Sequence, residues 1–198
     1  MRGPLHIDTD VLAVRKLCVG PFENNVYVVA CRATGAAIVV DAADEADRIV
    51  GACDGLDVAA IVTTHGHWDH IQAAEAVRDR LDVALLVHPA DAGDLPGTAP
   101  IPEVVEVGDL RFEARHLPGH TPGSTCIIGH DLAFTGDTLF PGGPGATSGP
   151  DAFATIMRSI RTGLFTLPDV TLVLPGHGLD TTIGTERPHL DEWERRGF

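Results

Sequence analysis

The chain has 198 residues, of which 44% are hydrophobic and 21% charged, and its formal net charge is −14 at pH 7. This composition is typical of a globular protein with a substantial core and excludes a mainly disordered chain. The acidic balance argues against binding to a nucleic-acid backbone or an anionic lipid surface, because both need clustered Lys and Arg.

The cysteines and the N-terminus indicate the compartment. Cys18, Cys31, Cys53 and Cys126 are scattered singly, which predicts reduced, mostly buried thiols and a cytoplasmic protein. Residues 1–10 are polar and carry two acids, so they do not resemble a secretory signal. No stretch approaches the roughly 18 uninterrupted apolar residues of a membrane span. We therefore expect no membrane association; the oligomeric state stays open.

The first half of the chain predicts short strands followed by alternating strands and helices. Apolar or β-branched runs bounded by turn residues predict strands at residues 11–17, 25–30, 36–40, 58–63 and 83–87. Helical composition predicts helices over residues 44–52 and 71–80, the second with apolar residues on one face. Residues 90–102 are rich in Pro, Gly and Asp and are predicted to form a surface loop.

The second half repeats this alternation. Its predicted strands lie at residues 104–107, 110–116, 125–128, 132–135 and 170–174. The Gly- and Pro-rich residues 140–150 predict a loop, and residues 151–164 predict a helix with Asp151 as its N-terminal cap. Because no linker interrupts the pattern, we expect a single α/β domain over residues 1–198, with sheets inside and helices outside.

A cluster of metal-ligand residue types directly follows the predicted strand at residues 58–63. Three of the chain's ten histidines fall within His65-Gly66-His67-Trp68-Asp69-His70. Imidazole nitrogen and carboxylate oxygen are ligands of ions such as Zn²⁺, so this segment predicts a metal site. His65 and His67 can converge on one ion, whereas Asp69 and His70 begin the next helix and can turn toward a second.

Three later segments each place one more ligand type beside a glycine, at the end of a predicted strand. These residues are His120 in LPGHTPGS, Asp137 in FTGDT and His177 in LPGHG. Loops at strand ends are where α/β folds often carry functional groups. Alone, each segment is better explained as a turn; together with the first cluster they predict one shared site.

The series THGHWDH, PGHTPGS, GDTLF and PGHG resembles the metallo-β-lactamase-fold superfamily, and within it the short members of the glyoxalase II (hydroxyacylglutathione hydrolase) group. The resemblance extends from Asn25-Val26-Tyr27 and Asp41 to the PGHG segment. It implies an α/β fold in which two mixed β-sheets, flanked by helices, form an αββα sandwich. It also implies a dinuclear metal site along one edge of the sheets.

The same resemblance implies a division of the ligands between two divalent metal ions. The first ion would be held by His65, His67 and His120. The second would be held by Asp69, His70 and His177, with Asp137 bridging both and Asp41 in a supporting role. Zinc is the default for such mixed ligands, and iron or manganese also suit them.

Such a site implies hydrolysis by a metal-bridging hydroxide, because a water between two cations loses its proton near neutral pH. The expected substrate is a small-molecule thioester such as an S-hydroxyacyl small thiol, with Asp69 and Asp137 as catalytic residues. Glutathione itself is not implied. The chain ends at Phe198 without the helical extension of the glutathione-specific enzymes, and residues 141–147 do not match their thiol-binding positions.

Three alternatives remain from the sequence. Related proteins of the same fold are mononuclear-iron persulfide dioxygenases, whose ligands would correspond to His65, His120 and Asp137. A lactone or ester hydrolase would use the same dinuclear site. A non-catalytic protein that uses the fold only to bind a metal is the third alternative.

Overall fold

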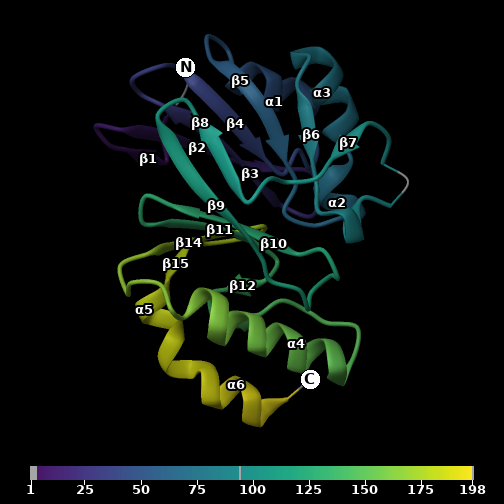
Figure 1. Ribbon diagram of the computed structural model, residues 1–198, viewed down its shortest axis with the longest axis vertical. Coiled ribbons are helices and arrows are strands. Elements are labelled where there is room, and N and C mark those ends of the chain that lie inside the picture. Colours follow the sequence, from purple (N-terminus) through teal and green to yellow (C-terminus); the bar gives the residue numbers. More distant parts are fainter. Residues whose placement is uncertain (1–3, 94, 198) are drawn as a thin grey trace.

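In the computed structural model, two β-sheets pack face to face between two layers of helices (Figure 1). The structure describes residues 4–93 and 95–197. Residues 1–3 and 198, at the ends of the predicted domain, and residue 94, in the predicted loop, lie outside the described residues. The predicted α/β class and αββα sandwich are confirmed. That the chain forms a single domain stays a prediction.

The first sheet contains, within the described residues, seven strands in chain order. They are β1 (Ile7–Asp8), β2 (Leu12–Val19), β3 (Asn24–Cys31), β4 (Ala36–Val40), β5 (Asp57–Val62), β6 (Ala84–Leu86) and β7 (Thr98–Ala99). Strands β1 to β4 are antiparallel, whereas β4 to β7 are parallel. The parallel strands need crossovers, which α1 (Ala46–Ala52), α2 (Trp68–Ile71) and α3 (Ala74–Leu81) provide.

The second sheet has the order β15-β14-β11-β10-β9-β8 in the described part of the chain. Its strands are β8 (Val104–Val107), β9 (Leu110–His116), β10 (Thr125–Gly129), β11 (Leu132–Gly136), β14 (Leu172–Pro175) and β15 (Thr181–Thr182). A small hairpin, β12 (Leu139–Phe140) with β13 (Gly143–Pro144), follows β11. The pair β11 and β14 is parallel, so the residues after both strands emerge at the same edge.

The helices cover the two outer faces of the sandwich. In Figure 1, α1 and α3 lie over the first sheet, and α4 (Pro150–Ser159) and α6 (Leu190–Arg196) lie beyond the second. Helix α4 continues into a π-helical turn at Ile160–Leu164, and α5 (Ile183–Glu186) precedes α6. Among the described residues, no helix combines the length and apolar character needed to cross a bilayer.

Aliphatic and aromatic side chains fill the space between the sheets. The rings of Tyr27 from β3 and Phe134 from β11 meet edge to face, with their centroids 5.2 Å apart. On the outer faces, Ile49 of α1 is buried against the first sheet, and Ile156 of α4 is buried against the second. Each large apolar side chain buried in this way contributes roughly 1.5–3 kcal/mol. This packing gives the loops at the sheet edge a rigid base.

The predicted helix over residues 71–80 differs in detail from the structure. The chain turns once in α2, interrupts the helix at Gln72 and Ala73, and resumes it as α3. The short α2 brings Asp69 and His70 toward the sheet edge before α3 packs on the sheet. The predicted cap Asp151 is also wrong, because α4 begins at Pro150. Asp151 lies in its first turn, where a carboxylate is favourable to the helix dipole.

The two predicted loops contain short regular elements. Residues 90–102 begin within a 3₁₀ turn at Pro89–Asp91 and include β7, and residues 140–150 include part of the β12–β13 hairpin. The pattern did not predict β1, β15, α5 or α6. These elements are too short for periodicity to show, and they depend on pairing or packing with distant segments.

Candidate metal centre

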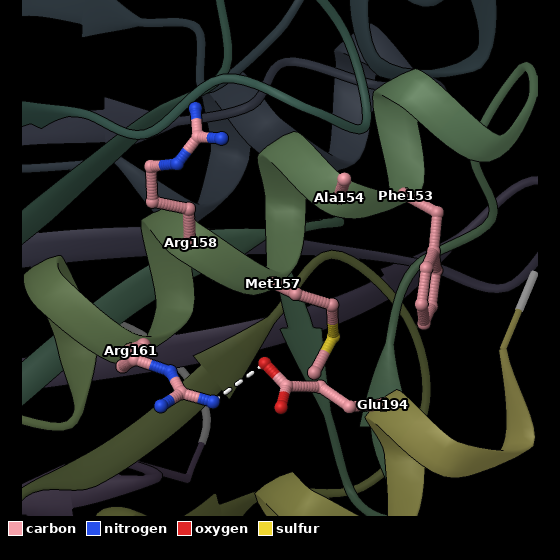
Figure 2. Close-up of a pocket in the computed structure, with 6 residues that line it drawn as sticks. All are labelled: Phe153, Ala154, Met157, Arg158, Arg161 and Glu194. Carbon is pink, nitrogen blue, oxygen red and sulfur yellow. Dashed lines mark hydrogen bonds and ion pairs between the residues drawn. The ribbon is translucent and has the colours of Figure 1, made fainter.

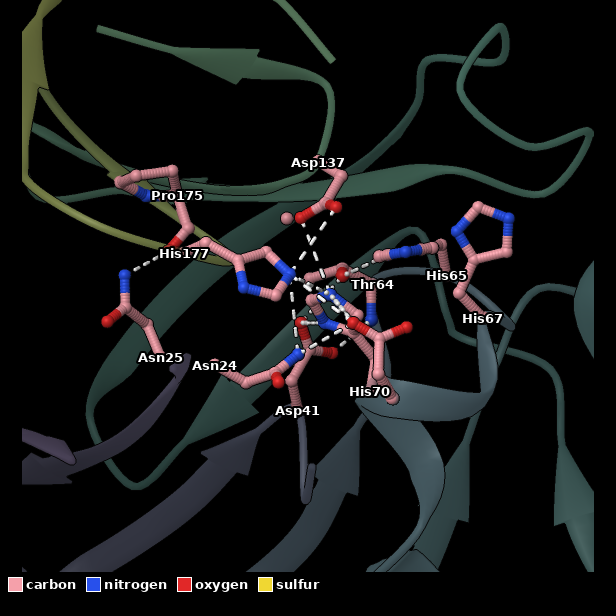
Figure 3. A network of polar contacts seen from close by, with 12 residues as sticks. Asn24, Asn25, Asp41, Thr64, His65, His67, His70, Asp137, Pro175 and His177 are labelled. Carbon is pink, nitrogen blue, oxygen red and sulfur yellow. Dashed lines mark hydrogen bonds and ion pairs between the residues drawn. The ribbon is translucent and has the colours of Figure 1, made fainter. Parts of the chain in front are cut away.

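The seven sequence-predicted ligands come together at one edge of the sandwich. They follow β5, begin α2, or follow β9, β11 and β14; they are His65, His67, Asp69, His70, His120, Asp137 and His177. Figure 3 shows His65, His67, His70, Asp137 and His177 among them. Because β4 and β5 are parallel to each other and β11 is parallel to β14, these strand ends meet at one edge. Residues from both sheets therefore form a single cluster.

The first triad consists of His65, His67 and His120. Each offers a nitrogen, and these atoms lie within 4.8 Å of one another. His120 Nε2 and His67 Nδ1 are 2.9 Å apart. The other ring nitrogen of His120, Nδ1, lies 2.7 Å from the carbonyl oxygen of Ala146. Donation by Nδ1 to that oxygen leaves the lone pair of His120 Nε2 directed into the triad.

The second triad consists of Asp69, His70 and His177, again with ligand atoms within 4.8 Å of one another. His70 Nε2 lies 3.2 Å from His177 Nε2, which lies 3.4 Å from Asp69 Oδ2. His177 Nδ1 donates to the carbonyl oxygen of Phe22 at 2.9 Å. Asn24 Nδ2 donates to Asp69 Oδ2 at 3.0 Å, which fixes the carboxylate.

Asp137 lies between the two triads. Its Oδ1 is 3.4 Å from His70 Nε2, and its Oδ2 is 3.6 Å from His120 Nε2 and from His177 Nε2. One carboxylate thus approaches imidazoles of both sets, as the predicted bridging position requires.

Asp41 supports one histidine of each triad. This buried carboxylate accepts hydrogen bonds from the Thr64 amide and the Thr64 hydroxyl, both at 2.7 Å, and from His70 Nδ1 at 3.0 Å. Thr64 Oγ1 in turn lies 3.1 Å from His65 Nδ1 and can accept a hydrogen bond from it. Both imidazoles therefore direct Nε2 toward the centre, an arrangement common among metal-ligating histidines.

Two buried atoms test whether the residues fit a metal. His65 Nε2 and Asp137 Oδ1 have no hydrogen-bond partner among the described residues. A buried polar atom left unpaired costs about 1–3 kcal/mol, so such atoms usually have a partner in the functional protein. Cations at the two triads would provide one for each atom. The nitrogen and oxygen donor set suits Zn²⁺, Fe²⁺ or Mn²⁺.

Burial and neighbouring charges shift the pKa values of the clustered side chains in different directions. Burial, together with the surrounding imidazoles, lowers the pKa of His65 well below its ordinary value, and burial also lowers that of His120. Burial acts in the same direction on His70, but Asp137 and Asp41 outweigh it and raise the pKa of His70 to about 10. Burial would raise the pKa of Asp137, but its contact with His70 prevails and lowers it. In the first triad, His65 and His120 are thus favoured in the neutral form, whereas His70 in the second triad holds a proton that a metal would displace.

The ligands are flanked by two different surfaces. Beside His120 is a pocket of about 200 Å³ lined by small apolar and hydroxyl residues: Pro118, Gly119, Thr121, Pro122, Ser148, Ala152 and Thr155. Beside the second triad, Trp68 and Phe22 are 56% and 51% exposed, with ring centroids 5.1 Å apart. Trp68 packs against Phe22 next to the site but stays open to solvent.

A larger pocket of about 430 Å³ lies between α4 and α6 (Figure 2). Its lining consists of Phe153, Ala154, Met157, Arg158, Arg161 and Glu194, and it includes none of the predicted ligands. Arg161 is exposed and pairs with Glu194 at 2.6 Å. Because this pocket contains no candidate metal ligand, its size alone gives no reason to place the reaction there.

Sequence reasoning missed two residues of the cluster. Asn24 and Thr64 are buried polar residues that hold Asp69 and His65. Thr64 stands at the start of the THGHWDH segment, and Asn24 adjoins Asn25-Val26-Tyr27. A polar side chain next to these motifs was the available signal, but only the fold brings Asn24 to Asp69.

Comparison with known proteins agrees with this geometry. A model of the metallo-beta-lactamase superfamily matches residues 19–177. Hydroxyacylglutathione hydrolase GloC of Haemophilus influenzae is 35% identical over 178 residues, covering 76% of this chain and 84% of that protein.

Two solved structures share the fold. ETHE1 from Myxococcus xanthus has a TM-score of 0.80 at 31% identity, covering 89% of this chain and 82% of that one. TTHA1623 in a di-iron-bound form has a TM-score of 0.75 at 30% identity, covering 88% of this chain and 97% of that one. The predicted resemblance is confirmed: the chain belongs to the metallo-beta-lactamase superfamily, with histidine and aspartate side chains positioned for metal binding.

Proposed function

We propose that this protein is a dinuclear metal-dependent hydrolase that cleaves thioesters of a small thiol. The observation that carries the proposal is the position of Asp137 between two complete triads. A mononuclear site built from His65, His120 and Asp137 would not explain why Asp69, His70 and His177 also converge as a second set of possible ligands. The similarity to a hydroxyacylglutathione hydrolase supports the thioester class.

Two bound divalent ions would lower the pKa of a water held between them, polarise the thioester carbonyl and stabilise the departing thiolate. The chain's own residues prepare this arrangement. Asp41 and Thr64 hold the imidazoles in one tautomer, so no reorganisation is needed when substrate binds. Asn24 fixes one oxygen of Asp69, and the second carboxylate oxygen can orient the attacking water.

The cysteines give no competing nucleophile at this edge. Burial raises the pKa of Cys53 to about 11 and that of Cys126 to about 12, so neither is a thiolate at neutral pH. Cys18 is exposed, but it lines a different pocket with Lys16 and His6. A contact with Thr34 lowers the pKa of Cys31, but this buried thiol stands at the end of β3 opposite to Asn24, the residue that contacts Asp69. Water is therefore the proposed nucleophile.

The two flanking surfaces favour a substrate with a small acyl group. The lining of the pocket beside His120 includes Thr121, Ser148 and Thr155 but no carboxylate and no cationic Lys or Arg. It suits a small hydroxyacyl group better than a charged one. On the other side, Phe22 and Trp68 offer an apolar surface to the arm of the thiol.

A substrate panel on metal-loaded protein tests the proposal. Protein prepared with Zn²⁺, Fe²⁺ or Mn²⁺ is given S-hydroxyacyl thioesters of glutathione and of N-acetylcysteamine, a simple lactone, and a persulfide with oxygen monitored. We expect about two ions per chain and thiol release from at least one thioester. One iron per chain with oxygen uptake on the persulfide would overturn the proposal, as would turnover of the lactone alone.

The matched variants are Asp69→Asn and Asp54→Asn. Both remove one negative charge, but Asp54 is exposed in the loop that precedes β5, whereas the ligands His65 and His67 follow the other end of that strand. Thioester turnover should fall by roughly a thousandfold in the first and stay unchanged in the second. Near-wild-type turnover by Asp69→Asn would contradict the mechanism.

A further inference from the structure

Asp91 connects two loops that carry predicted ligands, although it belongs to a segment predicted to be a surface loop. It ends the 3₁₀ turn Pro89–Asp91 after β6. Its carboxylate is turned inward: Oδ2 accepts the Gly66 amide at 2.9 Å and the Thr121 hydroxyl at 2.5 Å. The second oxygen, Oδ1, accepts the Gly123 amide at 2.7 Å.

The bonded groups flank the first triad. Gly66 lies between His65 and His67, and Thr121 directly follows His120. The first loop leaves β5 of one sheet and the second leaves β9 of the other, so the carboxylate spans the two halves of the sandwich. Within the described residues, the side-chain hydrogen bonds of Asp91 all go to these two loops.

The glycines of both loops fit the close approach of Asp91. A Cβ at Gly66 would lie 2.4 Å from the Asp91 carbonyl oxygen, and one at Gly123 would lie 2.5 Å from Asp91 Cγ. Neither glycine has a positive φ, so backbone conformation does not explain why they are glycines. Each loop instead leaves room for the same aspartate.

We propose that Asp91 is a positioning residue that holds the two loops in register, so that His65, His67 and His120 can bind one ion. The proposal rests on the proposed metal centre. Hydrogen bonds to an ionised carboxylate are stronger than neutral ones, and three of them converge here. A backbone hydrogen bond, from the Thr125 amide to the Thr64 carbonyl at 2.8 Å, also joins the two loops. Asp91 therefore adjusts the relative position of loops that are already in contact.

The test measures metal affinity separately at each triad. A His177→Ala background leaves the first triad to be titrated with Zn²⁺ against a chelator, and a His120→Ala background leaves the second. Into each we introduce Asp91→Asn, which keeps the size of the side chain but replaces one acceptor oxygen by an amide donor. Either the Gly123 amide, or the Gly66 amide together with the Thr121 hydroxyl, then loses its acceptor. Asp54→Asn is the control for the lost charge.

We expect Asp91→Asn to lower Zn²⁺ affinity by about tenfold or more at the first triad, and by less than about twofold at the second. Equal losses at both triads would show a general structural role and overturn the proposal. So would unchanged affinity at the first triad. Thermal unfolding of the metal-free variants provides the separate measure of stability.

A second pair of variants keeps the proposal testable if Asp91→Asn does not fold. Thr121→Val removes one of the three donors, whereas Thr121→Ser keeps the hydroxyl. The valine variant should lose several-fold in affinity at the first triad, and serine should restore most of it; equal affinities would contradict the proposal. Because the readout is metal affinity, a wild-type protein that binds two ions but hydrolyses no thioester would refute the proposed function and leave this test intact.

Discussion

The two triads lie side by side at the same edge of the sandwich, yet they differ in ligand charge and in protonation. The first contains only imidazoles, and burial keeps the pKa values of His65 and His120 low. The second contains Asp69 and a histidine, His70, whose pKa is raised to about 10 by Asp137 and Asp41 against the effect of burial. His65 and His120 are therefore ready to bind a cation, whereas His70 must release a proton to do so.

Their supports also differ. Asp41 orients a histidine in each triad, through Thr64 in one and directly in the other. Asn24 contacts only the second triad. Asp91 bonds only to the loops of the first. One compact cluster is thus built from two triads, and substitution of their different positioning residues can affect one triad without the other.

Removing one ligand from each triad should have the largest effect. His120→Ala and His177→Ala should each reduce metal content from about two ions per chain to about one, because each leaves the opposite triad complete. Thioester turnover should fall by roughly a thousandfold or more in both, since the proposed reaction uses both ions. Metal analysis of dialysed protein, together with a thiol-release assay, measures the two quantities. Loss of both ions from either variant would mean that the triads do not act separately.

Substitution of Asp41, which orients a histidine in each triad, should weaken metal binding at both triads. Substitution of Asn24 should weaken it at the second triad only. Asp41→Ala removes Oδ2, the oxygen that accepts from both the Thr64 hydroxyl and His70 Nδ1, so metal affinity should fall by about 10- to 100-fold at both triads. Asn24→Ala should lower affinity only at the second triad, because its amide holds Asp69. Chelator-competition titrations in the two single-triad backgrounds give the values. An effect of Asn24→Ala at the first triad would remove the distinction.

The candidate ligands could be picked out from the sequence because they are concentrated in short motifs at strand ends. His65, His67, Asp69 and His70 occupy six consecutive residues, and each remaining ligand is flanked by glycine. The apolar runs likewise predicted most central strands, since buried strands need continuous β-branched or aliphatic residues.

The residues that position the ligands, such as Asp91 and Asn24, could not be predicted because their roles depend on contacts between distant segments. Asp91 stands in a stretch whose Pro, Gly and Asp content is typical of a solvated loop, and only the fold turns it toward Gly66 and Gly123. Similarly, Asn24 is 45 residues from its partner Asp69. Short edge elements such as β15 form by pairing with β14 and carry no pattern of their own.

Metal binding should depend on pH more steeply at the second triad. His70 must be neutral to bind a metal, so below its raised pKa of about 10 the affinity should fall about tenfold for each unit that pH decreases. The low pKa values of His65 and His120 should keep affinity at the first triad nearly constant between pH 7 and pH 9. Titrations of the His120→Ala and His177→Ala variants over this range compare the slopes. Equal slopes would show that Asp41 and Asp137 do not hold a proton on His70.

The smallest expected effects concern the surfaces that flank the triads. Trp68→Ala removes an exposed ring beside the second triad, and KM for a thioester with an apolar thiol arm should rise about threefold to tenfold with kcat little changed. Ala152→Leu fills the pocket beside His120, so it should raise KM with the size of the acyl group instead. Steady-state kinetics on thioesters that vary first in the thiol and then in the acyl group distinguish the two. If Trp68→Ala responded to the acyl group and Ala152→Leu to the thiol, the substrate would lie across the centre in the opposite direction, with its acyl group beside the second triad.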